Sequence, residues 1–212
     1  MKEKGIVIVT AGSYDILHRG HRDVLKQVWN LAQAFGNSFF HTLVWSVNPS
    51  KVYLLTPKER VYIIKNFYIS EGIKSNIHIF PVLYEEHDPE ADKYFKELIG
   101  LSRYDSNLLF ITGIKEEDVK SFQVKLNKFH RNSGIESAKI VFVVSGWVNP
   151  IFNSSSKIKE FLYKHAFSHK AYLEAIEFLL KEDIIDTYTA NILINCRIRL
   201  LNMREFKNKR SL

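Results

Sequence analysis

The sequence predicts an α/β fold, a doubly wound five-strand parallel sheet followed by a helical C-terminal extension. Short apolar runs alternate with amphipathic segments through the first two thirds of the chain, as in successive βαβ units. Most of these runs are almost continuously apolar, which is typical of strands that are covered on both faces. The predicted strands are residues 6–10, 39–47, 77–82, 108–111 and 140–145.

Helix start signals separate the predicted strands. In TPKERVYIIKNF, Thr56 can cap the helix, Pro57 takes the first helical position and Glu59 completes a capping box. The segment DPEADKYFKELIG, from Asp88, begins in the same way and ends on a glycine. A third segment, KEEDVKSFQVKLNKFH, carries an apolar stripe at helical spacing, which predicts a helix whose stripe faces the core.

From about Ser168 onward the pattern shows helical periodicity alone. We therefore predict a sheet domain over residues 1–165 and a helical C-terminal extension over 166–212. The extension is expected either to pack on the sheet domain or to form a contact between copies of the chain in a homo-oligomer, and the sequence leaves both open. Cys196 lies in an apolar helical run and is predicted to be a core residue.

Composition narrows the class of protein. With 212 residues, 46% of them hydrophobic, the chain suits one domain of ordinary size with an appendage. The apolar runs are too short to span a bilayer, so no membrane partner is expected. A single cysteine excludes an internal disulfide and favours a reducing, cytoplasmic setting. The net charge of +7 favours anionic partners, namely nucleotides, phosphorylated metabolites or nucleic acid, without choosing among them. The basic tail MREFKNKRSL is interpreted as a solvated end rather than a nucleic-acid arm.

The segment GSYDILHRGHRDVL, residues 12–25, is the first candidate site. It follows the first strand, which ends near Thr10, and it leads into a helix that starts near Arg19 or Gly20. Ligands of open α/β sheets bind outside the carboxyl ends of the strands. A glycine-serine turn lets backbone N–H groups approach a phosphate, and the helix start adds further N–H groups and a positive dipole end.

Two histidines distinguish this segment. His18 and His21 are three residues apart, so both imidazoles can point to one side of the helix start. There they could donate hydrogen bonds to phosphate oxygens while charge moves during a transfer reaction. Gly20, between them, leaves room for a base or a phosphate. Two ordinary surface histidines are the alternative, but the position after a strand and a Gly-Ser turn favours a site.

Three motifs together resemble one family. GSYDILHRGH resembles the nucleotide-binding signature of the HxGH nucleotidyltransferase superfamily, which includes adenylyltransferases and cytidylyltransferases. SVNPSK with LLTPKERVYII, and later FNSSSKIKEF, are similar to segments of bacterial phosphopantetheine adenylyltransferases. The resemblance covers residues 5–162. It implies a Rossmann-like domain that moves a nucleoside monophosphate, AMP from ATP in the first place, onto a phosphorylated small-molecule acceptor and releases pyrophosphate.

The resemblance also implies roles for particular residues. His18, His21 and Lys51 would be catalytic, with Lys51 on the transferring phosphate. The residues expected to bind the nucleotide are Gly12, Ser13, Tyr14, Asp15, Gly20, Gly113, Lys115, Ser154, Ser155, Ser156 and Lys159. The serines would hold the β- and γ-phosphates, whereas Asp15 is expected mainly to fix the turn. Mg²⁺ is expected to accompany ATP or CTP, held mostly by phosphates and water, and no protein metal site is predicted.

Departures from the family pattern keep the acceptor open. Thr112 and Lys115 stand where phosphopantetheine adenylyltransferases carry two arginines, and lysine does not replace a bidentate arginine. Nicotinamide or nicotinate mononucleotide is an alternative acceptor, since the adenylyltransferases that use them share the HxGH and Ser-Ser-x-x-Ile-Arg pattern. ATP is favoured over CTP because the Arg-Thr-x-Gly segment of cytidylyltransferases is missing. A non-catalytic nucleotide- or nucleic-acid-binding module is the alternative of another class, although the retained histidines, Lys51 and the serine segment argue against it.

Overall fold

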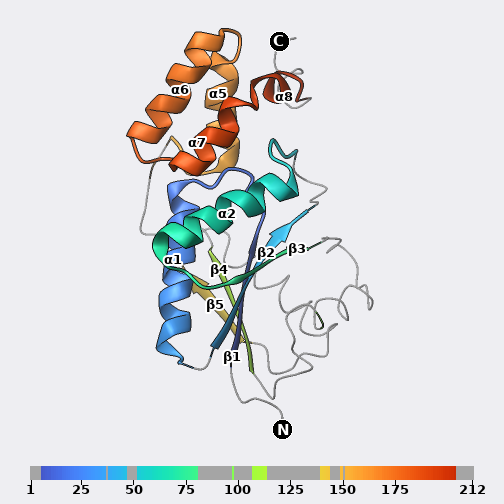
Figure 1. Ribbon diagram of the computed structural model, residues 1–212, viewed down its shortest axis with the longest axis vertical. Coiled ribbons are helices and arrows are strands. Elements are labelled where there is room, and N and C mark those ends of the chain that lie inside the picture. Colours follow the sequence, from blue (N-terminus) through green and yellow to red (C-terminus); the bar gives the residue numbers. More distant parts are fainter. Residues whose placement is uncertain are drawn as a thin grey trace.

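The computed structural model describes most of both predicted regions. The described residues are 6–36, 38–46, 52–80, 97, 107–113, 139–143, 149 and 151–203. They form an α/β structure in which helices cover a parallel sheet, with a cluster of helices after it (Figure 1). The predicted α/β class is therefore confirmed.

The strands pair in the order β3-β2-β1-β4-β5, and all of their described pairings are parallel. Their bounds are β1 Ile6–Gly12, β2 Ser38–Trp45, β3 Asn76–Phe80, β4 Asn107–Gly113 and β5 Lys139–Val143. The chain runs outward from β1 to β3 and then resumes on the other side of β1 with β4. The carboxyl edge between β1 and β4 is thus the point where the strand order reverses, which is the usual ligand position in such sheets.

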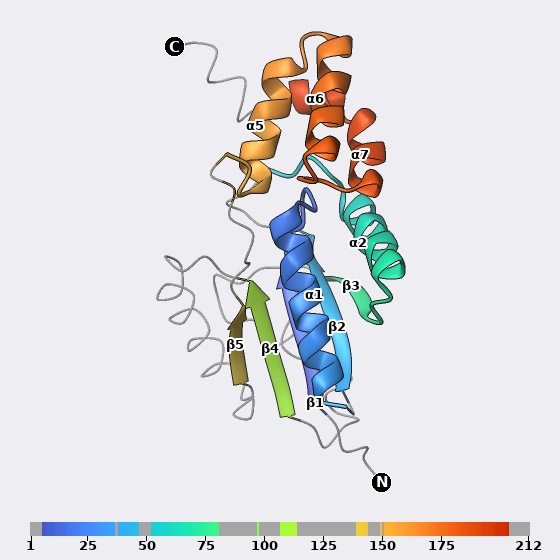
Figure 2. The same ribbon diagram turned by 90° about the vertical axis from the view of Figure 1, so that its left-hand side faces the viewer.

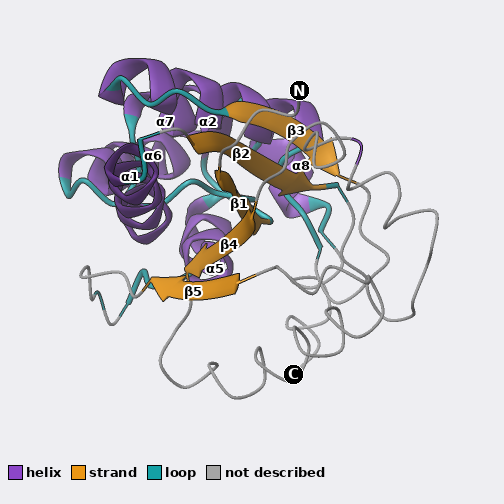
Figure 3. Ribbon diagram, turned by 90° about the horizontal axis from the view of Figure 1, so that it is seen from below, coloured by secondary structure: helices purple, strands orange, loops and turns teal. Residues whose placement is uncertain are grey.

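Helices α1 (Arg19–Ala34) and α2 (Pro57–Glu71) lie on the same face of the sheet (Figures 2 and 3). They belong to two successive crossovers in the same direction, from β1 to β2 and from β2 to β3. Right-handed crossovers place both helices on one face. Val7, Ile8 and Val9 of β1 are fully buried, as expected for a central strand.

The ends of α2 follow the predicted signals. The Thr56 hydroxyl accepts the Glu59 N–H (3.3 Å), and the Glu59 carboxylate accepts the Thr56 N–H (2.7 Å). Pro57 takes the first helical position, so the predicted capping box is confirmed. Gly72, with φ of 66°, ends the helix in the left-handed conformation that glycine adopts without strain. The two other predicted helices, from Asp88 and over 115–130, lie outside the described residues apart from Glu97, which is helical.

The C-terminal part is helical, as its periodicity predicts, and it stands over the carboxyl edge of the sheet (Figures 1 and 2). The predicted extension forms α6 His169–Lys181, α7 Thr187–Ile194 and α8 Arg197–Leu201. Helix α5, Ser155–His165, precedes the predicted boundary at residue 165 but lies with these helices (Figure 1), and the four together are the helical part. The buried Tyr172 hydroxyl of α6 donates to the Leu193 carbonyl of α7 (2.7 Å), and Cys196 is buried as predicted. Of the helices within the described residues, none is both long and apolar enough to cross a membrane.

Arg199 joins the last helix to the start of α2. Its guanidinium forms two hydrogen bonds with the Glu59 carboxylate, at 2.7 and 3.1 Å. It also donates to the Leu54 carbonyl (2.9 Å). The hydrogen bonds from Arg199 are the largest cause that lowers the pKa of Glu59, to about 2. The ion pair between Arg199 and Glu59 therefore links the helical part to the sheet domain at the capping box of α2.

A histidine pair joins β2 to β3 and gives the fold a predicted pH dependence. His41 Nδ1 lies 3.1 Å from His78 Nε2, and the rings stack at 5.3 Å. Burial, with a smaller contribution from the charge of His78, lowers the pKa of His41 from 6.5 to about 4. The unfolded chain therefore binds more protons than the folded protein between about pH 6.5 and pH 4, so stability falls as the pH drops through that window. The expected loss is at most about 3 kcal/mol.

Urea unfolding at pH 7 and pH 4.5 measures this loss. His41→Asn keeps a nitrogen or oxygen near the position of Nδ1 but cannot gain a proton, so the variant should lose less stability on acidification than the wild type. The matched control is His169→Asn at the exposed start of α6, which should keep the wild-type pH dependence. Equal pH dependence in His41→Asn and the wild type would contradict the assignment.

Candidate functional site

The turn between β1 and α1 lies at the edge where the strand order reverses. Tyr14 has φ of 47°, a left-handed conformation that is uncommon for a residue with a large side chain. Its buried ring covers Gly12, where an added Cβ would come within 2.7 Å of Tyr14 Cζ. Glycine at position 12 is therefore required by the tyrosine ring, whereas the sequence suggested close approach to a phosphate. Burial raises the pKa of Tyr14 to about 12, so its hydroxyl is protonated at neutral pH.

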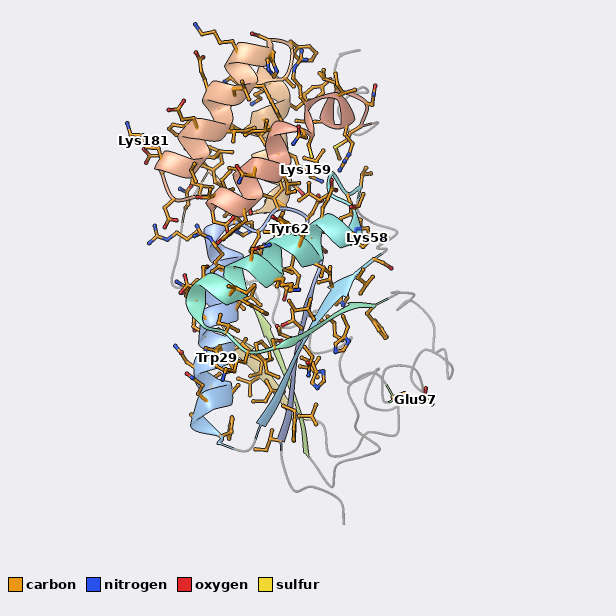
Figure 4. All side chains as sticks on the ribbon, in the orientation of Figure 1. Trp29, Lys58, Tyr62, Glu97, Lys159 and Lys181 are labelled. Carbon is orange, nitrogen blue, oxygen red and sulfur yellow. The ribbon has the colours of Figure 1, made fainter. Side chains whose placement is uncertain are left out.

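Asp15 fixes this turn, as predicted. Its Oδ1 accepts hydrogen bonds from the backbone N–H groups of Leu54 and Leu55, both at 2.9 Å. Its Oδ2 lies 3.1 Å from Lys159 Nζ, and both side chains are only 5% exposed. Lys159 also donates to the Val52 carbonyl (2.6 Å). The lysine lies where the helical part meets the sheet domain (Figure 4), and its amine could reach a bound phosphate only by leaving Asp15.

The two histidines lie together at the start of α1, as their spacing predicts. His18 is the N-cap residue and is 5% exposed, and its ring stacks on that of His21 with centroids 3.9 Å apart. Tyr14 meets His21 edge-on at 5.3 Å. His21 Nδ1 donates to the Ile16 carbonyl (3.1 Å), which can only accept. Since that bond places one proton on Nδ1, a second proton, gained when the ring becomes charged, would lie on Nε2.

The serine segment begins α5 next to the same turn. Ser154 is the N-cap residue, and its hydroxyl accepts the Lys157 N–H (3.4 Å). Ser155 Oγ donates to the Ile16 carbonyl (3.1 Å) and lies 3.3 Å from the Ile16 N–H, which points to it as donor. The Ile16 carbonyl thus accepts hydrogen bonds from both His21 and Ser155. Ser156 is exposed. The structure therefore brings the two predicted anion-binding segments together, but the hydroxyls of Ser154 and Ser155 form hydrogen bonds within the protein.

Arg60 is a structural member of the site. Its fully buried guanidinium donates to the carbonyls of Ser13 and Trp45, both at 2.7 Å, and of Ser46 at 3.3 Å. It also lies over the Tyr53 ring at 4.2 Å. Burial lowers the pKa of this guanidinium below its ordinary value. Its carbonyl contacts join the ends of β1 and β2 and give it a structural role.

The first turn of α1 is basic, and both of its arginines pair with Asp183 of a distant turn. Its residues, RGHR, include Arg19, Arg22 and the half-exposed Gly20, and they include no acid. The acid of the preceding turn, Asp15, is paired with Lys159. Among the described residues, no group of three or more His, Cys, Asp or Glu side chains could hold a metal ion.

Three further predicted residues lie toward this edge or beyond the described chain. Gly113 ends β4, and Gly12 ends the neighbouring parallel strand β1, so both lie at the carboxyl edge. Lys51 and Lys115 lie outside the described residues.

No model of a known protein family matches the chain, and a search of curated proteins finds no match either. The similarity of the three motifs to HxGH nucleotidyltransferases therefore remains an interpretation of these residues.

Proposed function

We propose that this chain is a nucleotidyltransferase built on a Rossmann-like, doubly wound five-strand sheet. It transfers AMP from ATP to a phosphorylated small-molecule acceptor and releases pyrophosphate. The observation that carries the proposal is the stacked pair His18–His21 at the start of α1, on the edge where the strand order reverses. Imidazoles and helix N–H groups converge there beside Arg19 and Arg22, which pair with Asp183. Imidazole and N–H donors of this kind suit a polyphosphate.

The reaction needs charge stabilisation more than covalent chemistry. An oxygen of the acceptor phosphate attacks the α-phosphorus of ATP, and the bond to the β-phosphate oxygen breaks with its electron pair on pyrophosphate. His21 holds its Nδ1 proton on Ile16, so its charged form donates from Nε2 to a phosphate oxygen. His18, stacked on it, acts on the same group. The acceptor phosphate is ionised near neutral pH, so the step requires no general base.

The remaining contacts follow the family resemblance. Ser156 and the N–H groups at the start of α5 hold the β- and γ-phosphates, and Lys51 and Lys115 add positive charge. Mg²⁺ neutralises part of the triphosphate charge when it is bound. Asp15, Lys159 and Arg60 act by holding the turn, since their polar atoms are engaged with protein groups.

A second candidate function is nucleotide binding without transfer. Two observations favour it: Lys159 is buried against Asp15, and Ser155 is bonded to the backbone of Ile16. Both leave fewer cationic or hydroxyl groups for the β- and γ-phosphates than the sequence predicts.

Pyrophosphate release in the presence of Mg²⁺ tests both candidates. ATP and CTP would each be combined with 4′-phosphopantetheine, nicotinamide and nicotinate mononucleotides, glycerol 3-phosphate and phosphocholine. We expect release with ATP and one of these acceptors. Calorimetric binding of ATP and CTP would be measured in parallel. Tight binding with no release in any combination would support the second candidate, and the absence of both binding and release would contradict both.

A further inference from the structure

The turn between α6 and α7, residues 182–186, packs against the start of α1. The Ile184 carbonyl accepts the Arg19 N–H (2.8 Å), and His18 forms an antiparallel bridge with Ile185. The backbone on both sides of the first histidine is therefore held by a segment of the helical part. Nothing in the three motifs points to this contact.

Charged side chains reinforce the contact. Arg22 Nη2 donates to Asp183 Oδ1 (2.8 Å) and to the Asp183 carbonyl (2.7 Å). Arg19 Nη1 lies 3.3 Å from Asp183 Oδ2. The Arg22 side chain is only 15% exposed, so its pair with Asp183 is partly shielded from water and from salt.

The turn is itself firmly held. Ile184 and Ile185 are buried, and both donate their N–H groups to the Leu179 carbonyl, at 2.9 and 3.3 Å. Asp186 caps α7 by accepting a backbone hydrogen bond of 2.7 Å. Asp183 has φ of 51°, a left-handed conformation that Asp and Asn adopt more readily than most residues. The turn can therefore act as a fixed support for α1.

We infer that Asp183 is a positioning residue for the histidine pair. Through Arg22 and Arg19 it fixes the first turn of α1, and with it the direction of the His18 and His21 rings. This gives the helical extension a task in the site. The effect on catalysis rests on the proposed function, whereas the effect on the rings does not.

Asp183→Asn tests the inference with little disturbance of the backbone. Asparagine tolerates the left-handed conformation and keeps the backbone carbonyl that accepts a hydrogen bond from Arg22. It removes the negative charge of the side chain that pairs with Arg19 and Arg22. We expect kcat for pyrophosphate release to fall about 10-fold to 100-fold, as for small misplacements of catalytic groups, with less than a twofold change in KM for ATP. The matched control is Asp186→Asn, the same substitution in the same turn, which should keep kcat within twofold of wild type. Equal kcat values in the two variants would overturn the inference.

Histidine ring signals provide a readout that does not depend on turnover. The ¹H–¹³C signals of His18 and His21, assigned with His18→Gln and His21→Gln variants, should shift in Asp183→Asn and stay in place in Asp186→Asn. If the wild type releases no pyrophosphate with any substrate, the proposed function fails, yet these shifts would still support the positioning role. Ring signals that do not move in Asp183→Asn would overturn it, whatever the turnover.

Discussion

Replacing His18 with alanine is expected to lower kcat for pyrophosphate release by about 100-fold to 1,000-fold, the usual effect of removing one donor to a developing charge. The imidazole stacks on His21 at 3.9 Å and belongs to the N-cap residue of α1. Removing the His18 imidazole eliminates one hydrogen-bond donor to the phosphate and also removes the ring on which His21 stacks. The fold should persist, because the backbone of the turn is held by Asp15, Ser155 and the α6–α7 turn.

Thermal unfolding followed by circular dichroism separates the two effects. His18 is buried, so His18→Ala should also lower the melting temperature by a few degrees, and His18→Gln, which fills more of the space, by less. His169→Ala, at an exposed histidine, is the control for activity and for stability. Turnover like that of the wild type in a folded His18→Ala variant would contradict the proposed mechanism.

The second large effect is expected from breaking the ion pair between Asp15 and Lys159. Lys159→Met keeps the apolar stem but leaves a carboxylate that is 5% exposed without its cation. Removing one partner of a buried pair costs about 3–5 kcal/mol of unfolding free energy, which is a large share of the stability of a typical domain. The Asp15 carboxylate still accepts hydrogen bonds from two backbone N–H groups in the variant, so we expect a loss of unfolding free energy toward the lower end of this range.

Urea unfolding of Lys159→Met measures this cost, with Lys170→Met as the matched control. Lys170 pairs with Glu174 at 3.8 Å on the surface, where the two side chains are 87% and 62% exposed. That substitution should change the unfolding free energy by less than about 0.5 kcal/mol. A loss below about 1 kcal/mol in Lys159→Met, together with lost ATP binding, would instead assign the amine to the nucleotide.

Features set by local chemistry could be predicted from the sequence. Thr56 and Glu59 form their capping box because both partners lie within one turn of helix. Ser154 caps α5, and the apolar runs become strands, because each depends on neighbouring residues. His18 and His21 lie together because helical spacing alone brings them to one side of α1.

Features that join distant segments could not be predicted. Lys159 follows a serine motif, a context that suggests a phosphate contact, and only the folded chain shows Asp15 beside it. Asp183 belongs to a turn without any motif, and its partners Arg19 and Arg22 resemble ordinary surface arginines in the sequence. The position of Tyr14 over Gly12 depends on a left-handed backbone that composition does not reveal.

The contact of Arg199 with Glu59 bears on how the protein unfolds. Arg199 donates hydrogen bonds to the Glu59 carboxylate, which also caps α2. Unfolding of α8 therefore removes a partner from the first turn of α2, and unfolding of that turn removes the partner of α8. Segments coupled in this way open together as one cooperative unit. The chain should therefore lose its sheet and its C-terminal helices in a single transition, and a cut near residue 165 should yield no fragment that folds independently.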